Sequence, residues 1–397
     1  MKIAERIKAI PASLTLAITA KAKAMKAEGI DVVGFGAGEP DFDTPEAIKK
    51  AAKDALDAGI TKYTPAGGTP EMKKAVCAKM KRDRGLDYTP EQVIINCGGK
   101  HSFYNLAQVT LDPGDEVIIP APYWLSYPEM VKLADGVPVI IDTGVDQDFL
   151  ATPEQVEKAI TKRTVALVLN SPSNPTGMMY TPEQIRAIAD VCLAKGVMVW
   201  SDEIYEHLIY GDAVHCSPAE LSPEHFANTV VLNGMSKTWS MTGWRLGWTC
   251  GPKEIIGAMN RLQSHQTSNP TSFAQTGGVV GLERPLEHLD EWLASFDERR
   301  RLIVGRLNAI PGIRCPEPKG AFYVFPDVSA FYGKTICGKK VTDSMSFADA
   351  LLEGANVAIV PGIAFGDDKG VRLSYAIAKA AIEKGLGRIE KALREAS

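Results

Sequence analysis

The sequence predicts an α/β protein with a large domain built on a mostly parallel, doubly wound sheet and a smaller α+β domain. A chain of 397 residues is too long for one ordinary hydrophobic core. Helix-start signals alternate with short apolar runs over roughly residues 45–280, as in sheets with helices on both faces. The pattern changes after about residue 285. We therefore expect a large domain of residues 45–285 and a small domain of residues 1–44 and 286–397.

The tripeptide Thr-Pro-Glu marks the expected helix starts. It begins at Thr44, Thr69, Thr89, Thr152 and Thr181. Threonine is a good cap, proline suits the first helical position and an acid suits the first turn. The irregular spacing excludes an internal repeat. After Thr181, apolar residues at helical spacing predict a helix that stops at Gly196.

Short β-rich runs lie between these helices. They are VIIN (93–96), EVIIPAP (116–122), PVIID (138–142), VALVLN (165–170), VMVW (197–200) and TVVLN (229–233). The runs are apolar throughout rather than alternating, which is typical of strands buried on both faces.

The last third of the chain has a different order of elements. A charged helix from about residue 287 precedes a strand-like GAFYVFP, a further helix, the run VRLSYAIA and a final helix. This order indicates a small α+β domain, which the first forty or so residues are expected to join. The chain has no low-complexity linker, so the two domains are expected to pack closely.

Composition excludes several classes of function. The chain is 45% hydrophobic and 23% charged, with a net charge of −4 and no block of like charge, so neither nucleic acid nor a membrane surface is an expected partner. The N-terminus lacks a signal-peptide apolar region, and no apolar run is long enough to span a bilayer. Seven cysteines form no disulfide pattern, which favours free thiols and a cytoplasmic location. The six histidines show no metal-ligand spacing, so no metal is expected.

Polar residues follow the carboxyl ends of the predicted strands, where open parallel sheets bind ligands. Gly98 and Gly99 open a helix after the first run, and bare N–H groups there make either an anion site or a plain tight turn. Asn174 follows the fourth run between two prolines, where it is either a turn residue or a ligand group. Asp202 and Tyr205 follow the fifth, and by itself such an aspartate is more often a helix cap.

A lysine and an arginine follow the last run. Lys237 stands among bulky apolar residues, and Arg245 comes eight residues later. An anion cradle, an amide, a carboxylate with a phenol and these two cations therefore meet at one sheet edge. One ligand uses them all, because pyridoxal 5′-phosphate carries a phosphate, a ring nitrogen, a phenolic oxygen and an aldehyde.

The same residues lie in a series of ordered motifs. These are GAGEPDFDTP (36–45), TKYTPAGG (61–68), GGK (98–100), DPGDEV (112–117), APYWLSYPEM (121–130), NSPSNPTG (170–177), SDEIYEHL (201–208), SKTWSMTGWRLG (236–247) and VRLSYA (371–376). In these motifs the chain resembles the aspartate-aminotransferase-type enzymes, class I of the fold type I pyridoxal-phosphate family, in the branch with a GGK loop. The resemblance runs from about Pro11 to the last helix, and it implies a small domain that closes over the active site.

The resemblance implies a role for each catalytic group. Lys237 would form the Schiff base and then act as general acid and base, for which it must be neutral. Asp202 would keep the pyridine nitrogen protonated, so that the ring is a stronger electron sink. Tyr205 and Asn174 would hydrogen-bond the phenolic oxygen, and Trp124 would stack on the ring.

The resemblance also implies the groups that hold phosphate and substrate. The phosphate would be held by Arg245, by Ser236, and by the GGK loop of Gly98, Gly99 and Lys100. Tyr63 would reach the phosphate of the neighbouring subunit, since relatives have their active sites at a homodimer interface. Arg372 would grip the substrate α-carboxylate with its planar fork. Gly38, Trp124 and Asn174 would also contact the substrate. Lys100, Ser13 and Thr15 match positions that read a second carboxylate, which favours aspartate.

Two positions depart from the family pattern. Pro11 stands where relatives that accept prephenate have a basic residue, which counts against that substrate. His101 follows GGK where close relatives commonly have glutamine, and a residue so near the phosphate could alter affinity or pH dependence.

We therefore expect a homodimeric aminotransferase that moves the amine of an L-amino acid, most simply aspartate, to 2-oxoglutarate with ping-pong kinetics. Alternatives are transamination of aromatic or prephenate-type keto acids, and β-elimination, decarboxylation or synthase chemistry on the same scaffold. A dinucleotide-binding oxidoreductase at GFGAGEP lacks the last glycine of its motif. A silent regulator with this fold would need an added DNA-binding segment.

Overall fold

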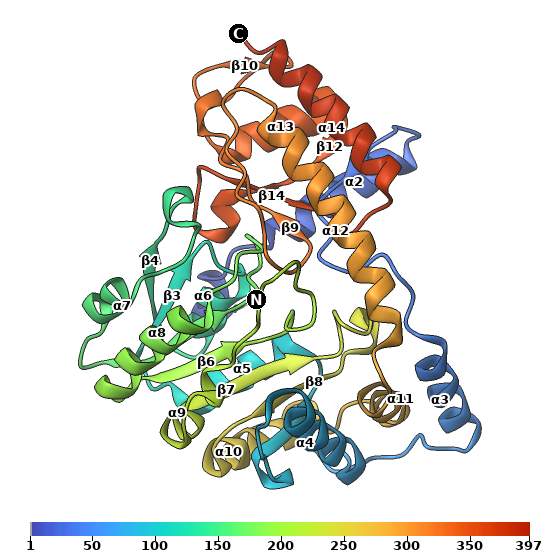
Figure 1. Ribbon diagram of the computed structural model, residues 1–397, viewed down its shortest axis with the longest axis vertical. Helices are drawn as coiled ribbons and strands as arrows, with labels where there is room; N and C mark the ends of the chain where they lie inside the picture. Colours follow the sequence, from blue (N-terminus) through green and yellow to red (C-terminus); the bar gives the residue numbers. More distant parts are fainter. Residues whose placement is uncertain (1) are drawn as a thin grey trace.

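The computed structural model describes residues 2–397, and its largest element is a seven-stranded sheet (Figure 1). The strand order is β2-β8-β7-β6-β5-β3-β4. The strands are β2 (Val93–Asn96), β3 (Glu116–Ala121), β4 (Val137–Asp142), β5 (Thr164–Asn170), β6 (Met198–Asp202), β7 (Thr229–Gly234) and β8 (Gly247–Cys250). The six predicted strands are therefore confirmed to within a residue or two at each end.

Strand β8 is the one strand of this seven-stranded sheet that the sequence did not predict. It runs antiparallel between β2 and β7, while the pairs among β3, β4, β5, β6 and β7 are parallel. Its sequence, Gly-Trp-Thr-Cys, is short and lacks a β-branched run. Because β8 returns antiparallel, the loop between β7 and β8 begins and ends at the same edge of the sheet.

Helices cover both faces of this sheet. One face packs against α5 (Gly99–Thr110), α6 (Ser126–Leu133) and α10 (Lys253–Ser264). The other face packs against α4 (Pro70–Arg84), α7 (Pro153–Ala159), α8 (Pro182–Lys195) and α11 (Ser272–Glu283), with α3 (Glu46–Asp57) on α11 and α9 (Pro223–Asn228) beside α8. Successive residues of β2 enter opposite cores, Ile94 on one face and Ile95 on the other.

The expectation that all these strands are buried on both faces is wrong for β4. Val137 and Ile140 on this strand are exposed, because β4 is an edge strand at the end of the sheet.

The Thr-Pro-Glu signals have two outcomes. The side chains of Thr69, Thr152 and Thr181 cap α4, α7 and α8, as predicted. Thr89 starts only a 3₁₀ turn, Pro90–Gln92. Thr44 does not cap α3, because its hydroxyl donates instead to the carbonyl oxygen of Ser240 (2.7 Å).

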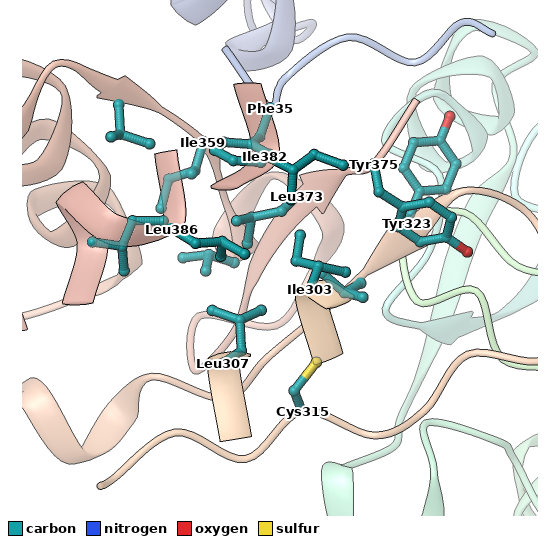
Figure 2. Packing of buried hydrophobic residues seen from close by; sticks show 14 of the residues in the cluster. Phe35, Ile303, Leu307, Cys315, Tyr323, Ile359, Leu373, Tyr375, Ile382 and Leu386 are labelled. Carbon is teal, nitrogen blue, oxygen red and sulfur yellow. The ribbon is translucent and has the colours of Figure 1, made fainter. Parts of the chain in front are cut away.

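The C-terminal elements form a second core above the sheet (Figure 1). They are α12 (Glu287–Asn308), β9 (Tyr323–Val324), β10 (Thr335–Ile336), β11 (Lys339–Lys340), α13 (Ser344–Ala355), β12 (Val357–Ala358), β13 (Val360–Pro361), β14 (Val371–Ser374) and α14 (Lys379–Arg394). Figure 2 shows Ile303 of α12, Leu373 of β14 and Leu386 of α14 meeting in this core with Phe35 from the N-terminal part.

The N-terminal segment lies in two places. Strand β1 (Val33–Gly34) pairs parallel with β12, and α2 (Leu14–Ala27) packs near β12 and β13. The short helix α1 (Glu5–Lys8) instead contacts α6 of the large sheet.

The remaining regular turns are short 3₁₀ helices. They are Val145–Gln147, Pro218–Glu220, Thr242–Trp244, Ser329–Phe331 and Gly362–Phe365. Across residues 2–397, the structure contains no helix with the length and apolar character needed to cross a membrane.

Candidate active site

A cavity of about 810 Å³ lies at the carboxyl edge of the large sheet, below the C-terminal core. Most of the predicted site residues line it, namely Ser13, Thr15, Gly38, Gly99, Lys100, Trp124, Asn174, Asp202, Tyr205, Ser236, Lys237, Arg245 and Arg372. Gly98 lies just behind the wall. Tyr63 lies elsewhere, and its side chain is 90% exposed.

Lys237 is in the loop between β7 and β8, so it returns to the edge where the other polar groups lie. Its ammonium nitrogen donates to the carbonyl oxygen of Gly38, and it lies 5.7 Å from the centre of the Tyr205 ring. Burial lowers the pKa of Lys237 from 10.5 to about 8, and the positive charge of Arg372 acts in the same direction. At pH 7 roughly a tenth of this amine is therefore neutral, far more than of an ordinary lysine, and nucleophilic attack on a carbonyl requires the neutral form.

Asp202 ends β6 on the floor of the cavity. Its Oδ2 accepts a hydrogen bond from the Tyr127 hydroxyl (2.5 Å), and its Oδ1 accepts one from the N–H of Ile204 (3.2 Å). Burial raises the pKa of Asp202 to about 6, while the hydrogen bonds from Tyr127 and Ile204 oppose that rise. The group is thus mainly a carboxylate at pH 7, able to hold a cationic ring N–H.

The anion cradle is built from backbone that approaches without side chains. Gly98 has φ of 89°, and a Cβ there would lie 2.7 Å from the guanidinium carbon of Arg245. A Cβ on Gly247 of β8 would lie 2.6 Å from the carbonyl carbon of Gly98. Arg245 is held by its own hydrogen bond to the carbonyl oxygen of Thr242 (2.9 Å). Together with the N-terminus of α5, this makes a phosphate-sized site.

Lys100 and Trp124 form one wall of the cavity. The Lys100 ammonium lies 5.1 Å from the centre of the Trp124 ring, which is within the range of a cation–π contact. Partial burial and the nearby charge of Arg245 lower the pKa of Lys100. A second anionic group on a ligand would relieve this repulsion.

His101, whose purpose the sequence left open, links the cradle to the turn that follows α10. Its Nδ1 accepts from the N–H of Cys97 (3.1 Å), so its Nε2 carries the proton and donates to Gln266 (2.7 Å). Burial lowers the pKa of His101, which favours this neutral form. The carbonyl oxygen of Cys97 in turn accepts from Arg245 (3.4 Å), so His101 helps to fix the arginine that faces the anion site.

Arg372 also lines the cavity and is only 2% exposed. Its two terminal nitrogens donate to Asn174 Oδ1 (2.9 Å) and to the carbonyl oxygen of Gly36 (2.8 Å). Its Nε is buried and has no hydrogen-bond partner among the residues that the structure describes. Burial lowers the pKa of this group, and a carboxylate would compensate its charge.

Tyr205 and Asn174 both line the cavity and have different hydrogen-bond partners there. The Tyr205 hydroxyl lies 3.0 Å from the hydroxyl of Tyr323, and Asn174 is bonded to Arg372. At the N-terminal side of the cavity, the Thr15 hydroxyl is buried without a hydrogen-bond partner among the described residues, and Ser13 lies beside it in the chain. The exposed Pro11 lines the same side and brings no charge.

Residues 36–44, which we call the crossing segment, connect the C-terminal core to α3 (Figure 1). Gly36 and Gly38 accept hydrogen bonds from Arg372 and Lys237. Asp41 accepts two hydrogen bonds from Arg299 of α12 (2.8 and 2.9 Å). The Phe42 ring stacks on the Trp292 ring, with the two ring centroids 4.7 Å apart. The crossing segment is therefore held both by Lys237 and Arg372 in the cavity and by side chains of α12.

The sequence did not reveal a buried charge network behind the site. Its centre is Glu206, which accepts from the fully buried Lys79, from Arg84 (3.1 Å) and from Asn233 (2.6 Å). Glu203 lies beside it and accepts from Ser201, Ser217 and His215. The spacing in SDEIYEHL was the available signal for this network. Asp202 and Tyr205, three residues apart, line the cavity, whereas Glu203 and Glu206, also three apart, point away from it.

Glu203, Glu206 and His215 are close enough to share a metal ion. The oxygens of Glu206, however, already take hydrogen bonds from Lys79, Arg84 and Asn233, and the two cations neutralise the acids. This cluster is better explained as an ion-pair network than as a metal site.

Comparison with known proteins agrees with this geometry. The family model described as aminotransferase class I and II matches residues 30–389. The chain is 53% identical to an aspartate aminotransferase from Geobacillus stearothermophilus and 49% identical to an aspartate/prephenate aminotransferase from Cereibacter sphaeroides, each match covering 98% of both chains.

Solved structures give the same result for the fold. The crystal structure of the aspartate aminotransferase from Rhizobium meliloti has a TM-score of 0.96 at 44% identity and covers 100% of both chains. That of the Thermus thermophilus enzyme with maleate has a TM-score of 0.93 at 42% identity and covers 99% of this chain and 100% of the other. The predicted fold class and the dependence on pyridoxal 5′-phosphate are confirmed, and the chain belongs to the class I and II aminotransferases.

Proposed function

We propose that this aminotransferase takes the amino group of L-aspartate and passes it to 2-oxoglutarate. The observation that carries the proposal is the position of Lys237, a buried amine with a pKa of about 8 in the same cavity as Asp202 and Arg372. The aspartate aminotransferase names of relatives about 50% identical over nearly the whole chain support the choice of donor.

The cavity residues fit the cofactor group by group. The cradle of Gly98, Gly99, Arg245 and Ser236 would hold the phosphate, and Asp202 would hold the ring nitrogen. When bound, pyridoxal 5′-phosphate supplies an aldehyde for amine exchange and a ring that stabilises negative charge at the substrate α-carbon. Trp124 would cover the ring, and Tyr205 and Asn174 would lie at its phenolic edge.

Lys237 would move the proton. With cofactor and substrate bound, the Lys237 amine would take the α-proton and return it elsewhere, because water competes poorly in its partly buried position. The lowered pKa suits this role, since a base with its usual pKa of 10.5 would be protonated at neutral pH.

Arg372 would hold the α-carboxylate, because its buried Nε and its planar fork offer parallel donors. Lys100, Ser13 and Thr15 would hold the second carboxylate, and the unpartnered Thr15 hydroxyl supports this. The Thermus enzyme, whose structure was solved with maleate, a dicarboxylate, has the same fold.

We further propose a homodimer, in which the exposed Tyr63 would reach the phosphate of the partner's site. The chain would divide into residues 45–285 and residues 1–44 with 286–397, the smaller part closing over the cavity. Seven free cysteines support a reducing, cytoplasmic location.

A second candidate function is transamination of prephenate, a keto acid that would accept the amino group, because several relatives 42 to 49% identical are named aspartate/prephenate aminotransferases. Pro11 lines the cavity without a positive charge, which favours aspartate.

The test is a panel of donors with product analysis. The purified chain with its cofactor should convert L-aspartate and 2-oxoglutarate to oxaloacetate and glutamate, and Lys237→Ala should abolish this reaction. Lys50→Ala, at an exposed helix lysine, is the control and should keep full activity. Pyruvate and ammonia from aspartate would identify a lyase instead, and faster turnover with prephenate would identify the second candidate.

A further inference from the structure

Tyr127 was not among the predicted site residues, yet it contacts two of them. Its hydroxyl donates to Asp202 Oδ2 at 2.5 Å. Its ring meets the Trp124 ring edge to face, with centroids 5.2 Å apart and an interplanar angle of 85°. It therefore lies between the group expected at the cofactor's ring nitrogen and the group expected on the ring face.

The position of Tyr127 is fixed by its surroundings. It is in the first turn of α6, where its N–H donates to the carbonyl oxygen of Trp124 (3.0 Å). Its ring packs on the Phe103 ring of α5, with centroids 4.8 Å apart. The Phe103 ring in turn packs on the Trp200 ring of β6, with centroids 5.4 Å apart. With only 2% of its surface exposed, Tyr127 has no room to swing its hydroxyl away from Asp202.

The hydroxyl can only be a donor in this place. Burial raises the pKa of Tyr127 well above its usual value, so the phenol keeps its proton. A carboxylate removed from water needs donors, and among the described residues Asp202 has two, the Tyr127 hydroxyl and the N–H of Ile204. The Tyr127 bond is the shorter of the two, at 2.5 Å against 3.2 Å.

We propose that Tyr127 is a positioning residue of the transamination reaction, whose hydroxyl holds the Asp202 carboxylate at the cofactor's ring nitrogen while its ring supports Trp124. This inference rests on the proposed function, because it assigns Asp202 and Trp124 to the cofactor. Loss of the hydroxyl leaves one fewer donor on a buried charge, which weakens the hold on the cofactor as well as the chemical step.

The test is Tyr127→Phe in the holoenzyme, a change that keeps the ring and its packing. A hydrogen bond to a charged group corresponds to a factor of roughly 10 or more in an equilibrium. We expect cofactor release, followed by loss of its visible absorbance during dialysis, to be roughly tenfold faster. We also expect kcat for aspartate to fall by a similar factor while KM changes less than about twofold.

Two comparisons show whether Tyr127 acts through Asp202. In a chain that already carries Asp202→Asn, adding Tyr127→Phe should change release less than about twofold. Tyr180→Phe is the matched control, because Tyr180 is also buried and uses its hydroxyl in one hydrogen bond, from the N–H of Ala151 at 3.0 Å. It should lower the melting temperature without changing release.

Unchanged release and kcat in Tyr127→Phe would overturn the proposal, and so would an equal effect of Tyr127→Phe with and without Asp202→Asn. These outcomes leave the proposed function intact if the unsubstituted enzyme still binds the cofactor and converts aspartate. An unsubstituted enzyme that lacks the cofactor's absorbance would overturn both.

Discussion

Lys237 should react with pyridoxal 5′-phosphate as an amine of pKa about 8. The perturbation is pH, applied to the cofactor-free chain between pH 6 and pH 10. At pH 7 an amine with this pKa is roughly 9% neutral, whereas an amine of pKa 10.5 is roughly 0.03% neutral. Lys237 should therefore react roughly 300 times faster at pH 7 than an exposed lysine of equal intrinsic reactivity.

The assay measures covalent uptake of the cofactor. Samples taken after mixing are reduced with borohydride, and mass spectrometry counts the modified Lys237. The rate should rise about tenfold per pH unit below 8 and level off above it. Nα-acetyl-lysine in the same buffers is the control: its rate divided by its own neutral fraction gives the cofactor's titration, and the Lys237 rate is divided by that result. A midpoint near 10 would refute the reasoning.

A substitution at Glu39 tests the electrostatic part of the argument. The negative charge of Glu39 opposes the lowering of the Lys237 pKa, and its Oε2 accepts from the Thr242 hydroxyl (2.9 Å). Glu39→Gln keeps an acceptor there and removes the charge, so the midpoint should fall below 8. Thr242→Val, which keeps the charge, should leave the midpoint in place. A rise in the midpoint of Glu39→Gln would contradict this account.

Three further predictions follow from the geometry. Arg372→Lys should lower kcat/KM for aspartate roughly 100-fold, because a lysine cannot reproduce the planar fork that also holds Asn174. Arg314→Lys, at an exposed ion pair, should leave kcat/KM unchanged in the same assay. Gly98→Ala should weaken cofactor binding at least about tenfold in a fluorescence titration, because its φ of 89° and the nearby Arg245 both disfavour a Cβ there. An unchanged cofactor affinity of Gly98→Ala would show that the cradle can shift to admit the methyl group. Lys79→Met should lower stability by about 3 kcal/mol, measured by thermal unfolding, because it leaves Glu206 buried without its nearest cation. Adding Glu206→Met should recover most of that loss, and Lys81→Met, at an exposed pair, should cost less than about 1 kcal/mol.

The parts of the site that could be predicted from sequence are those set by the sheet. The carboxyl ends of parallel strands share one edge, so Gly98, Asn174, Asp202 and Lys237 had to come together once the strands were recognised. The family motifs then suggested Arg372 and Trp124, which lie far away in the chain. The structure confirms that all of these residues except Gly98 line one cavity.

The parts that sequence did not predict depend on side-chain direction. Tyr127 and Tyr323 are ordinary aromatic residues until their hydroxyls are seen to meet Asp202 and Tyr205. Glu206 and Lys79 are 127 positions apart, and nothing in either local pattern shows that they are buried together. Strand β8 was missed because a four-residue run with only two strand-favouring residues, Trp248 and Thr249, is too short to stand out and is fixed by its two neighbouring strands.

The crossing segment limits how the upper part of the molecule can move. Its Gly36 carbonyl accepts from Arg372, the arginine expected to meet the substrate, and its Gly38 carbonyl accepts from Lys237, the lysine expected to react, while Asp41 is bonded to Arg299 of α12. Any rotation of the C-terminal core relative to the large sheet would therefore displace this nine-residue segment, which contacts the Lys237 amine. A carboxylate that binds Arg372 would compete with the Gly36 carbonyl oxygen for the same guanidinium group. Substrate binding would therefore weaken one of the hydrogen bonds that hold the crossing segment.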